Sequence, residues 1–128
     1  MEKVGIYIHI PFCRRQCFYC HFTRFPYDEE LVNRYVKALA GEIRLRSAPS
    51  FQVESIYLGG GSPSVLSKKQ FSHIIDAIFE SFPTTGDVEF TVEMNPDDVT
   101  KGKLQLYRSY KVNRISLDTQ SFEESDLQ

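Results

Sequence analysis

Four short segments rich in β-branched and aromatic residues alternate with longer amphipathic segments, and this alternation constrains the fold most. The segments with strand character are residues 4–10, 53–58, 87–94 and 112–118. The intervals between them carry apolar residues at helical spacing, over about 29–46, 68–82 and 100–110. This cadence predicts a parallel sheet whose strands are joined by right-handed helical crossovers.

Two of the three predicted helices have clear start signals. Asp28 precedes two glutamates, so a capping carboxylate and two first-turn charges that favour the helix dipole stand together. Ser67 followed by Gln70 matches a capping box, and the apolar positions after it recur at i, i+3, i+4, i+7 and i+8. The third helix has the weakest signal because Gly102 lies within it.

The length of 128 residues suits one domain at most. The fourth strand segment is followed by residues 121–128, which look like the start of another helix just where the sequence stops. We therefore interpret residues 1–128 as the truncated N-terminal portion of a partial α/β barrel, with about four of its strands. The alternative is a small open α/β domain with four strands.

Each predicted strand has one apolar face and one more polar face, because successive side chains point to opposite sides. Tyr7 lies on the polar face of the first strand, and Glu93 lies on that of the third. Gly61 and Gln120 have the matching parity at the ends of the second and fourth strands. Ligands of parallel α/β sheets and barrels bind at the C-terminal ends of the strands, so these residues predict a ligand cavity there.

All three cysteines lie in the loop after the first strand, as Cys13, Cys17 and Cys20 in the pattern C-x3-C-x2-C. An odd and clustered set fits a disulfide framework badly and is more typical of metal binding or redox chemistry. The residues alone leave three interpretations open. These are a zinc site completed by His9 or His21, a redox dithiol that leaves one cysteine unexplained, and an iron–sulfur cluster with one open iron.

The cysteine spacing after a first strand, with Tyr19 before the last cysteine, resembles the radical S-adenosylmethionine (SAM) superfamily. In that superfamily three cysteines hold a [4Fe–4S] cluster whose open iron chelates SAM, and one electron cleaves SAM to a 5′-deoxyadenosyl radical. The segments IYIHIPFC, YLGGGSPS, EMNPDD and VNRISLDTQSF further resemble the oxygen-independent coproporphyrinogen III oxidase family and its haem-chaperone relatives of the HemW type. This resemblance runs from Ile6 to Phe122 and implies a partial radical SAM barrel.

The resemblance implies a set of cofactor-binding residues but assigns no catalytic side chain. The implied cluster ligands are the three cysteines. The residues implied to contact SAM are Tyr7, Tyr19, Gly60, Gly61, Ser62, Glu93 and Gln120. Four of these are also the residues that strand parity alone places on the polar side of the sheet.

One departure separates the branches of the resembled family. In the oxidases another cysteine follows the third one after a single residue, whereas this chain has Phe22 at that position. We therefore favour a haem chaperone over an oxidase that decarboxylates coproporphyrinogen III in porphyrin biosynthesis. Reductive SAM cleavage fits either branch, so whether the protein is an enzyme stays open. A zinc-binding structural domain is the alternative from another class.

Charge and hydropathy restrict the partners. The formal net charge of −2 gives no global field for binding nucleic acid. No apolar run approaches the length of a membrane span, and the N-terminus lacks a signal-peptide layout, so we predict a cytoplasmic protein. The resemblance adds three partners: SAM, haem or another tetrapyrrole, and an electron donor such as a flavodoxin or a ferredoxin.

Overall fold

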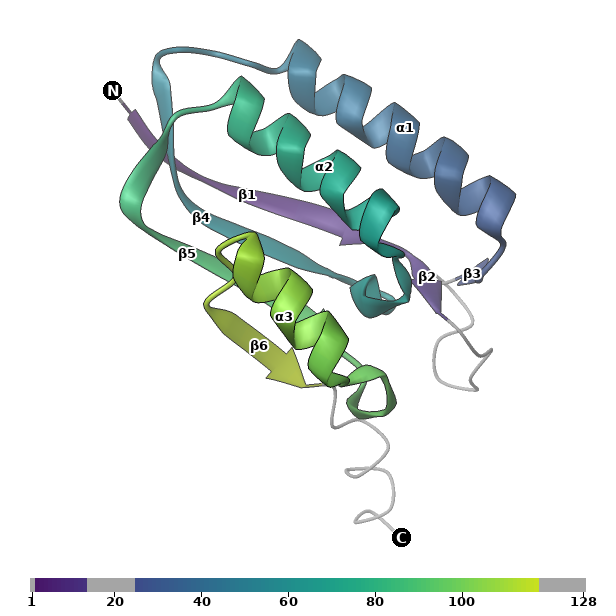
Figure 1. Ribbon diagram of the computed structural model, residues 1–128. Helices are drawn as coiled ribbons and strands as arrows, with labels where there is room; N and C mark the ends of the chain where they lie inside the picture. Colours follow the sequence, from purple (N-terminus) through teal and green to yellow (C-terminus); the bar gives the residue numbers. More distant parts are fainter. Residues whose placement is uncertain (1, 14–24, 118–128) are drawn as a thin grey trace, which may run out of the picture.

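The computed structural model describes residues 2–13 and 25–117. Its main sheet has four parallel strands in the order β1-β4-β5-β6. The strands are β1 (Glu2–Ile10), β4 (Phe51–Gly60), β5 (Thr84–Met94) and β6 (Arg114–Leu117). The predicted parallel sheet with helical crossovers is therefore confirmed (Figure 1). The predicted continuation at 121–128 lies outside the described residues.

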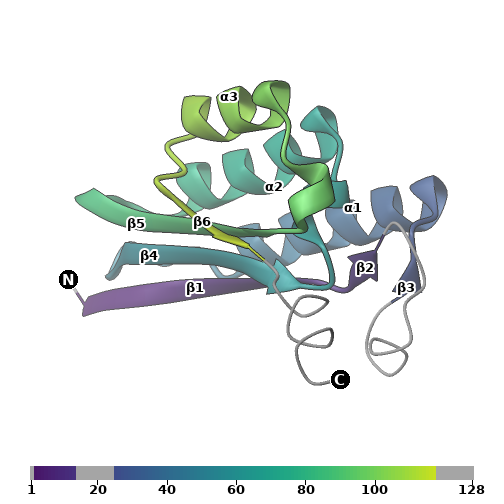
Figure 2. The same ribbon diagram turned by 90° about the horizontal axis from the view of Figure 1, so that it is seen from below.

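Three helices form one layer against one face of this sheet. They are α1 (Glu29–Leu45), α2 (Lys68–Ser81) and α3 (Lys101–Ser109). Figure 2 shows all three on the same side of the strands, and within the described ranges no helix covers the other side. We call the uncovered side the open face. None of the described helices is long and apolar enough to cross a membrane.

The predicted start signals of α1 and α2 are confirmed. The Asp28 side chain accepts a hydrogen bond from the backbone N–H of Leu31 at 3.1 Å. At α2, Ser67 and Gln70 form both bonds of the capping box, at 3.1 and 2.8 Å. These bonds satisfy backbone N–H groups that have no partner within the helix.

Helix α3 is short and has the least burial. Thr100 caps it by accepting the N–H of Lys103 at 3.1 Å, and Tyr107 is its one fully buried residue. Gly102 is tolerated because a Cβ there would meet nothing within 4 Å. The helix is held mainly by Tyr107, whose ring packs on Phe71 of α2 with centroids 4.8 Å apart.

The hydrophobic core fills the space between the sheet and the helix layer. Alternate strand residues supply one side of it, as parity predicts. The fully buried apolar side chains include Ile8, Ile10, Ile56, Leu58, Phe90, Val92 and Met94 from the strands, and Val32, Val36, Phe71, Ile74, Ile75 and Ile78 from the helices. The open face contributes none of these residues.

Some short elements were not predicted. A second, two-stranded parallel sheet pairs β2 (Phe12–Cys13) with β3 (Phe25–Pro26). Short 3₁₀ turns, η2 (Pro63–Val65) and η3 (Pro96–Asp98), precede α2 and α3. The pairing of β2 with β3 joins residues 13 positions apart, which local sequence patterns do not carry. The 3₁₀ turns are closed by local bonds, such as that from the Val65 N–H to the Ser62 carbonyl at 2.9 Å.

Candidate functional site at the open face of the sheet

One row of side chains runs across the open face of all four strands. Tyr7 of β1 pairs in register with Tyr57 of β4, Tyr57 with Thr91 of β5, and Thr91 with Arg114 of β6. Thr91 is only 1% exposed although it lies on the open face, so its larger neighbours cover it. The row is aromatic at the β1 side and cationic at the β6 side.

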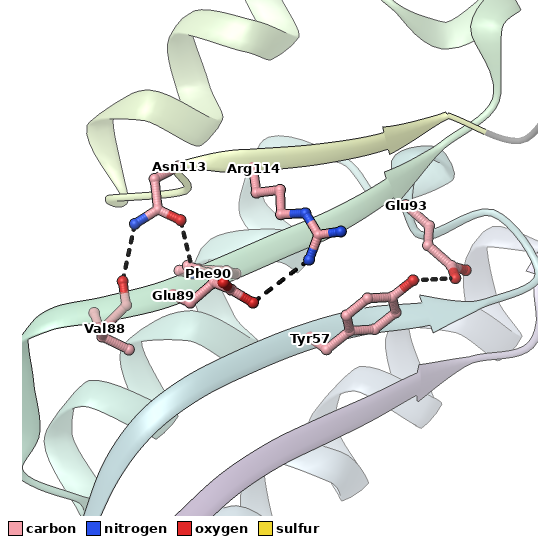
Figure 3. A network of polar contacts seen from close by, with 7 residues as sticks. All are labelled: Tyr57, Val88, Glu89, Phe90, Glu93, Asn113 and Arg114. Carbon is pink, nitrogen blue, oxygen red and sulfur yellow. Dashed lines mark hydrogen bonds and ion pairs between the residues drawn. The ribbon is translucent and has the colours of Figure 1, made fainter.

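Glu93 lies one step nearer the C-terminal end of β5 and is fixed by two donors from β4. The Tyr57 hydroxyl donates to its Oε2 at 2.6 Å, and the Gly60 N–H donates to its Oε1 at 3.1 Å. Figure 3 shows the first of these bonds bridging the two strands. The carboxylate is thus held in one orientation at the strand ends.

Tyr57 is a proton donor in this pair at neutral pH. The hydrogen bond to Glu93, and then burial, raises the pKa of the Tyr57 hydroxyl above its ordinary value. A hydrogen bond with the Ser116 side chain of β6 lowers the pKa of Tyr57, but by less. The phenol therefore stays protonated well above neutral pH, and the carboxylate retains its donor.

Tyr7 is the most accessible aromatic of the site. It is 57% exposed, stacks on Tyr57 with ring centroids 5.8 Å apart at an interplanar angle of 22°, and shares a 3.1 Å hydrogen bond with His9 Nδ1. Burial, and then the charge of Glu93, raises the pKa of Tyr7. A half-exposed aromatic ring beside a fixed carboxylate suits a ligand that carries both a ring and a positive charge.

The glycine run makes close backbone contacts at the end of β4. Gly60 has a φ of 113°, which favours glycine, and a Cβ there would meet the His9 ring at 2.9 Å. A Cβ at Gly61 would collide with the backbone of Phe12. The N–H groups of Gly61 and Ser62 donate to the carbonyls of Ile10 and Phe12, both at 2.7 Å. At Gly61 the missing Cβ therefore makes room for the chain itself.

An ion pair and an amide clamp tie β6 to β5 on the same side (Figure 3). Arg114 lies 3.5 Å from Glu89. The Asn113 side chain donates to the Val88 carbonyl and accepts from the Phe90 N–H, both at 2.9 Å. The Asn113 backbone N–H also donates to the Phe90 carbonyl at 3.0 Å, so backbone and side-chain bonds together fix the start of the short edge strand against β5.

The structure brings part of the predicted site together. Tyr7 and Glu93 share the open face, and Gly60 donates directly to Glu93. Ser62 is 7% exposed and hydrogen-bonded through its backbone to the start of β2. The backbone of Cys13 ends β2 beside this loop. Cys17, Tyr19, Cys20 and Gln120, together with the Cys13 side chain, lie outside what the structure describes.

Sequence reasoning missed Tyr57 and Gly59 as parts of the site. A Cβ at Gly59 would meet the Glu93 carboxylate at 2.9 Å and the Tyr57 ring at 2.8 Å. Both residues have the same strand parity as Gly61, so the sequence contained a signal for their place on the polar side. Their contact with Glu93 could not be predicted from the sequence, because Tyr57 and Glu93 are 36 residues apart.

The described residues at this end of the sheet fit SAM, and the three cysteines that would hold a [4Fe–4S] cluster follow directly in the sequence. The loop with the three cysteines begins at Cys13, at the same strand ends as Glu93. The fixed carboxylate suits the cationic groups of SAM, and the exposed Tyr7 ring suits its apolar or aromatic parts. Among residues 2–13 and 25–117 no cluster of metal-ligating side chains stands elsewhere.

Comparisons with known proteins agree with this geometry. The profile described as "Radical SAM superfamily" matches residues 7–127. "Heme chaperone HemW" of Bacillus subtilis is 38% identical over 95% of this chain and 33% of its own length. The protein of that name from Escherichia coli is 34% identical over 99% of this chain and 34% of its own length.

Oxidases also match. "Oxygen-independent coproporphyrinogen III oxidase" of Paracoccus denitrificans is 31% identical over 94% of this chain and 28% of its own length. A solved structure titled "Coproporphyrinogen III oxidase (HemN) from Escherichia coli is a Radical SAM enzyme" superposes with a TM-score of 0.83 at 28% identity, covering 91% of this chain and 27% of that one.

This chain spans about a third of the length of the relatives it matches. The matched strands and helices favour the predicted partial barrel over an independent open domain. The superfamily profile covers nearly the whole sequence, including the cysteine loop and the strand that carries Glu93. The chain therefore belongs to the radical SAM superfamily.

Proposed function

We propose that this chain is the N-terminal part of the radical SAM core of a longer protein, and that this protein binds a [4Fe–4S] cluster and SAM and acts as a haem chaperone. The proposal rests on two features that lie at the C-terminal ends of the strands. The cysteine loop begins there at the end of β2, and the fixed Glu93 carboxylate stands at the adjoining end of β5.

In this proposal Cys13, Cys17 and Cys20 hold the cluster, which supplies one electron for reductive cleavage of a carbon–sulfur bond of SAM. The residues that meet SAM are those implied by the resemblance: Tyr7, Tyr19, Gly60, Gly61, Ser62, Glu93 and Gln120. Glu93 pairs with a cationic group of SAM, and Tyr7 borders the ligand with its exposed ring. The protein thus binds and orients SAM in a fixed site.

The preference for a chaperone over an oxidase rests on Phe22. It stands where the oxidases have a further cysteine, in the loop that carries the cluster ligands. The identities differ in the same direction but narrowly, with 34–38% to four HemW proteins and 31–33% to three oxidases. The 0.83 TM-score to an oxidase structure keeps oxidation of coproporphyrinogen III as the second candidate.

Anaerobic reconstitution of the full-length protein with iron and sulfide tests the cluster. We expect about four irons and four sulfides per protein and a broad absorption near 400 nm, as for cubane clusters. The Cys17→Ala variant serves as the control and should bind little iron. A colourless protein with one tightly bound zinc would contradict the cluster and indicate a structural zinc site instead.

Two further assays separate the candidate functions. Haem titration of the reconstituted protein should give a stoichiometric complex that passes its haem to an apo-acceptor. Supplying coproporphyrinogen III, SAM and a reductant should give no decarboxylated product. Product formation at a rate dependent on SAM would instead establish the oxidase.

A further inference from the structure

Tyr57 has no assigned role, yet it makes the shorter of the two hydrogen bonds to the Glu93 carboxylate. Its hydroxyl donates to Glu93 Oε2 at 2.6 Å, within the range of charge-assisted O–H···O⁻ bonds. The Gly60 N–H holds the other carboxylate oxygen at 3.1 Å. Both donors belong to β4, so the neighbouring strand determines where the carboxylate of β5 points (Figure 3).

The space that the carboxylate occupies is also provided by β4. A Cβ on Gly59 would come within 2.9 Å of Glu93 Oε1 and 2.8 Å of the Tyr57 ring. Real Cβ atoms essentially never come so close, so an alanine would displace one of the two side chains. Residues 57, 59 and 60 therefore form a cradle that accepts Glu93 in one orientation.

Tyr57 is itself held in place from both sides. Its ring stacks on Tyr7 at 5.8 Å and 22°, and on the other side it pairs in register with the buried Thr91. A ring packed in this way loses little further conformational entropy when a ligand binds. Pre-ordered groups of this kind increase affinity, because the ordering cost is met during folding.

We propose that Tyr57 is a positioning residue that increases the affinity for SAM by fixing the Glu93 carboxylate, with Gly59 providing the space. This inference rests on the proposed function, in which Glu93 meets a cationic group of SAM. Tyr57 acts through Glu93 and need not contact the ligand. Without its hydroxyl, Glu93 keeps one donor and can adopt other rotamers, so binding must order it again.

The first test measures SAM binding to the reconstituted full-length protein by equilibrium dialysis. The Tyr57→Phe variant removes one oxygen and keeps the stacked ring. We expect its dissociation constant for SAM to rise about tenfold, the scale of one hydrogen bond to a charged group. Tyr110→Phe, on the helix side, is the matched control and should leave the constant within about twofold. An unchanged affinity in Tyr57→Phe would overturn the inference.

A double-mutant cycle distinguishes action through Glu93 from a general structural effect. In a Glu93→Gln background, Tyr57→Phe should change SAM affinity by less than about twofold, because the group it positions is absent. An equal tenfold loss in both backgrounds would show that Tyr57 acts independently and would overturn the inference. If Glu93→Gln alone leaves SAM affinity unchanged, the proposed role of Glu93 fails instead.

A spectroscopic test needs neither cluster nor SAM. The difference in tyrosinate absorption near 295 nm between the protein and its Tyr57→Phe variant isolates the titration of Tyr57. Since the bond to Glu93 raises the pKa of Tyr57, Glu93→Gln should move this titration to lower pH. If the titration of Tyr57 does not move, Tyr57 is not hydrogen-bonded to Glu93 and the inference is wrong. The Gly59→Ala variant should give the same shift together with weaker SAM binding, and circular dichroism confirms that each variant is folded.

Discussion

The two faces of the sheet differ in what their side chains do. On the helix side, alternate residues of β1, β4 and β5 are fully buried and apolar, and they pack against α1 and α2. On the open face β1, β4 and β5 carry Tyr7, Tyr57 and Glu93, and the neighbouring β6 carries Arg114. Tyr57 is hydrogen-bonded to Glu93, and Arg114 forms an ion pair with Glu89 of β5. One strand thus supplies stability from one side and ligand chemistry from the other, so the two functions should respond separately to substitution.

The largest effect is expected in the core. Phe71 of α2 is 0% exposed and packs on Tyr107 and Tyr110. Phe71→Ala should lower the free energy of unfolding by about 3–5 kcal/mol, because it removes apolar burial and leaves a cavity. Urea unfolding followed by circular dichroism measures this loss. Tyr7→Phe on the open face is the comparison, and a loss of similar size there would contradict the division between the faces.

The next effect is expected at the rim where the two faces meet. Gly61→Ala would place a Cβ against the Phe12 backbone, so we expect a loss of about 1–3 kcal/mol from overpacking. Gly41→Ala in α1 is the matched control because a Cβ there meets nothing within 4 Å. That control should gain about 0.5–1 kcal/mol. If the two variants have equal free energies of unfolding in urea, the close contact between Gly61 and the Phe12 backbone does not affect stability and this prediction is wrong.

A pH-dependent effect is expected from Tyr107. Burial, and then the charge of Asp98, raises the pKa of its hydroxyl, which has no hydrogen-bond partner among the described residues. Its folded pKa lies above the unfolded value of about 10. The contribution of the protonated Tyr107 hydroxyl to the free energy of unfolding is therefore complete below about pH 10. It is lost as the pH rises towards the folded pKa.

Tyr107→Phe should therefore remove much of the loss of stability above pH 10. At neutral pH it should raise the free energy of unfolding by about 1 kcal/mol, since a buried and unpaired hydroxyl is removed while the ring remains. Thermal unfolding at pH 7 and pH 10.5 measures both effects. A variant less stable at pH 7 would indicate that the hydroxyl has a partner.

The smallest effect is expected from the ion pair on the open face. Arg114 and Glu89 are 3.5 Å apart, with side chains 60% and 61% exposed. Arg114→Ala should change the free energy of unfolding by less than about 0.5 kcal/mol, as is usual for exposed pairs. Asn113→Ala, which removes two bonds to the β5 backbone, should cost more. The reverse order in urea unfolding would show that charge, rather than the amide clamp, fixes β6.

The sequence predicted the elements of this fold better than the contacts between them. Strand parity placed Tyr7 and Glu93 on one face, and the capping signals at Asp28 and Ser67 marked helix starts, because both depend on neighbouring residues. The pairing of β2 with β3 went unseen. So did the contact of Tyr57 with Glu93, which depends on how two parallel strands lie in register.

The glycine run shows the same limit. Gly60 and Gly61 were expected to contact SAM, and the structure adds that Gly59 makes room for Glu93 and Gly61 for the Phe12 backbone. A glycine in a sequence indicates that something comes close, but it does not identify what does. That identity comes from the folded neighbours. The ligand contacts of Gly60, Gly61 and Ser62 stay predictions.

The most direct test of the account is electron paramagnetic resonance of the reconstituted, reduced full-length protein with and without SAM. If the cluster has an open iron beside Glu93, a reduced [4Fe–4S] signal should appear and change its g values on adding SAM. The change should require a higher SAM concentration in Glu93→Gln than in the unaltered protein. A cluster signal that SAM leaves unaltered at any concentration would contradict the proposal that this open face is a SAM site.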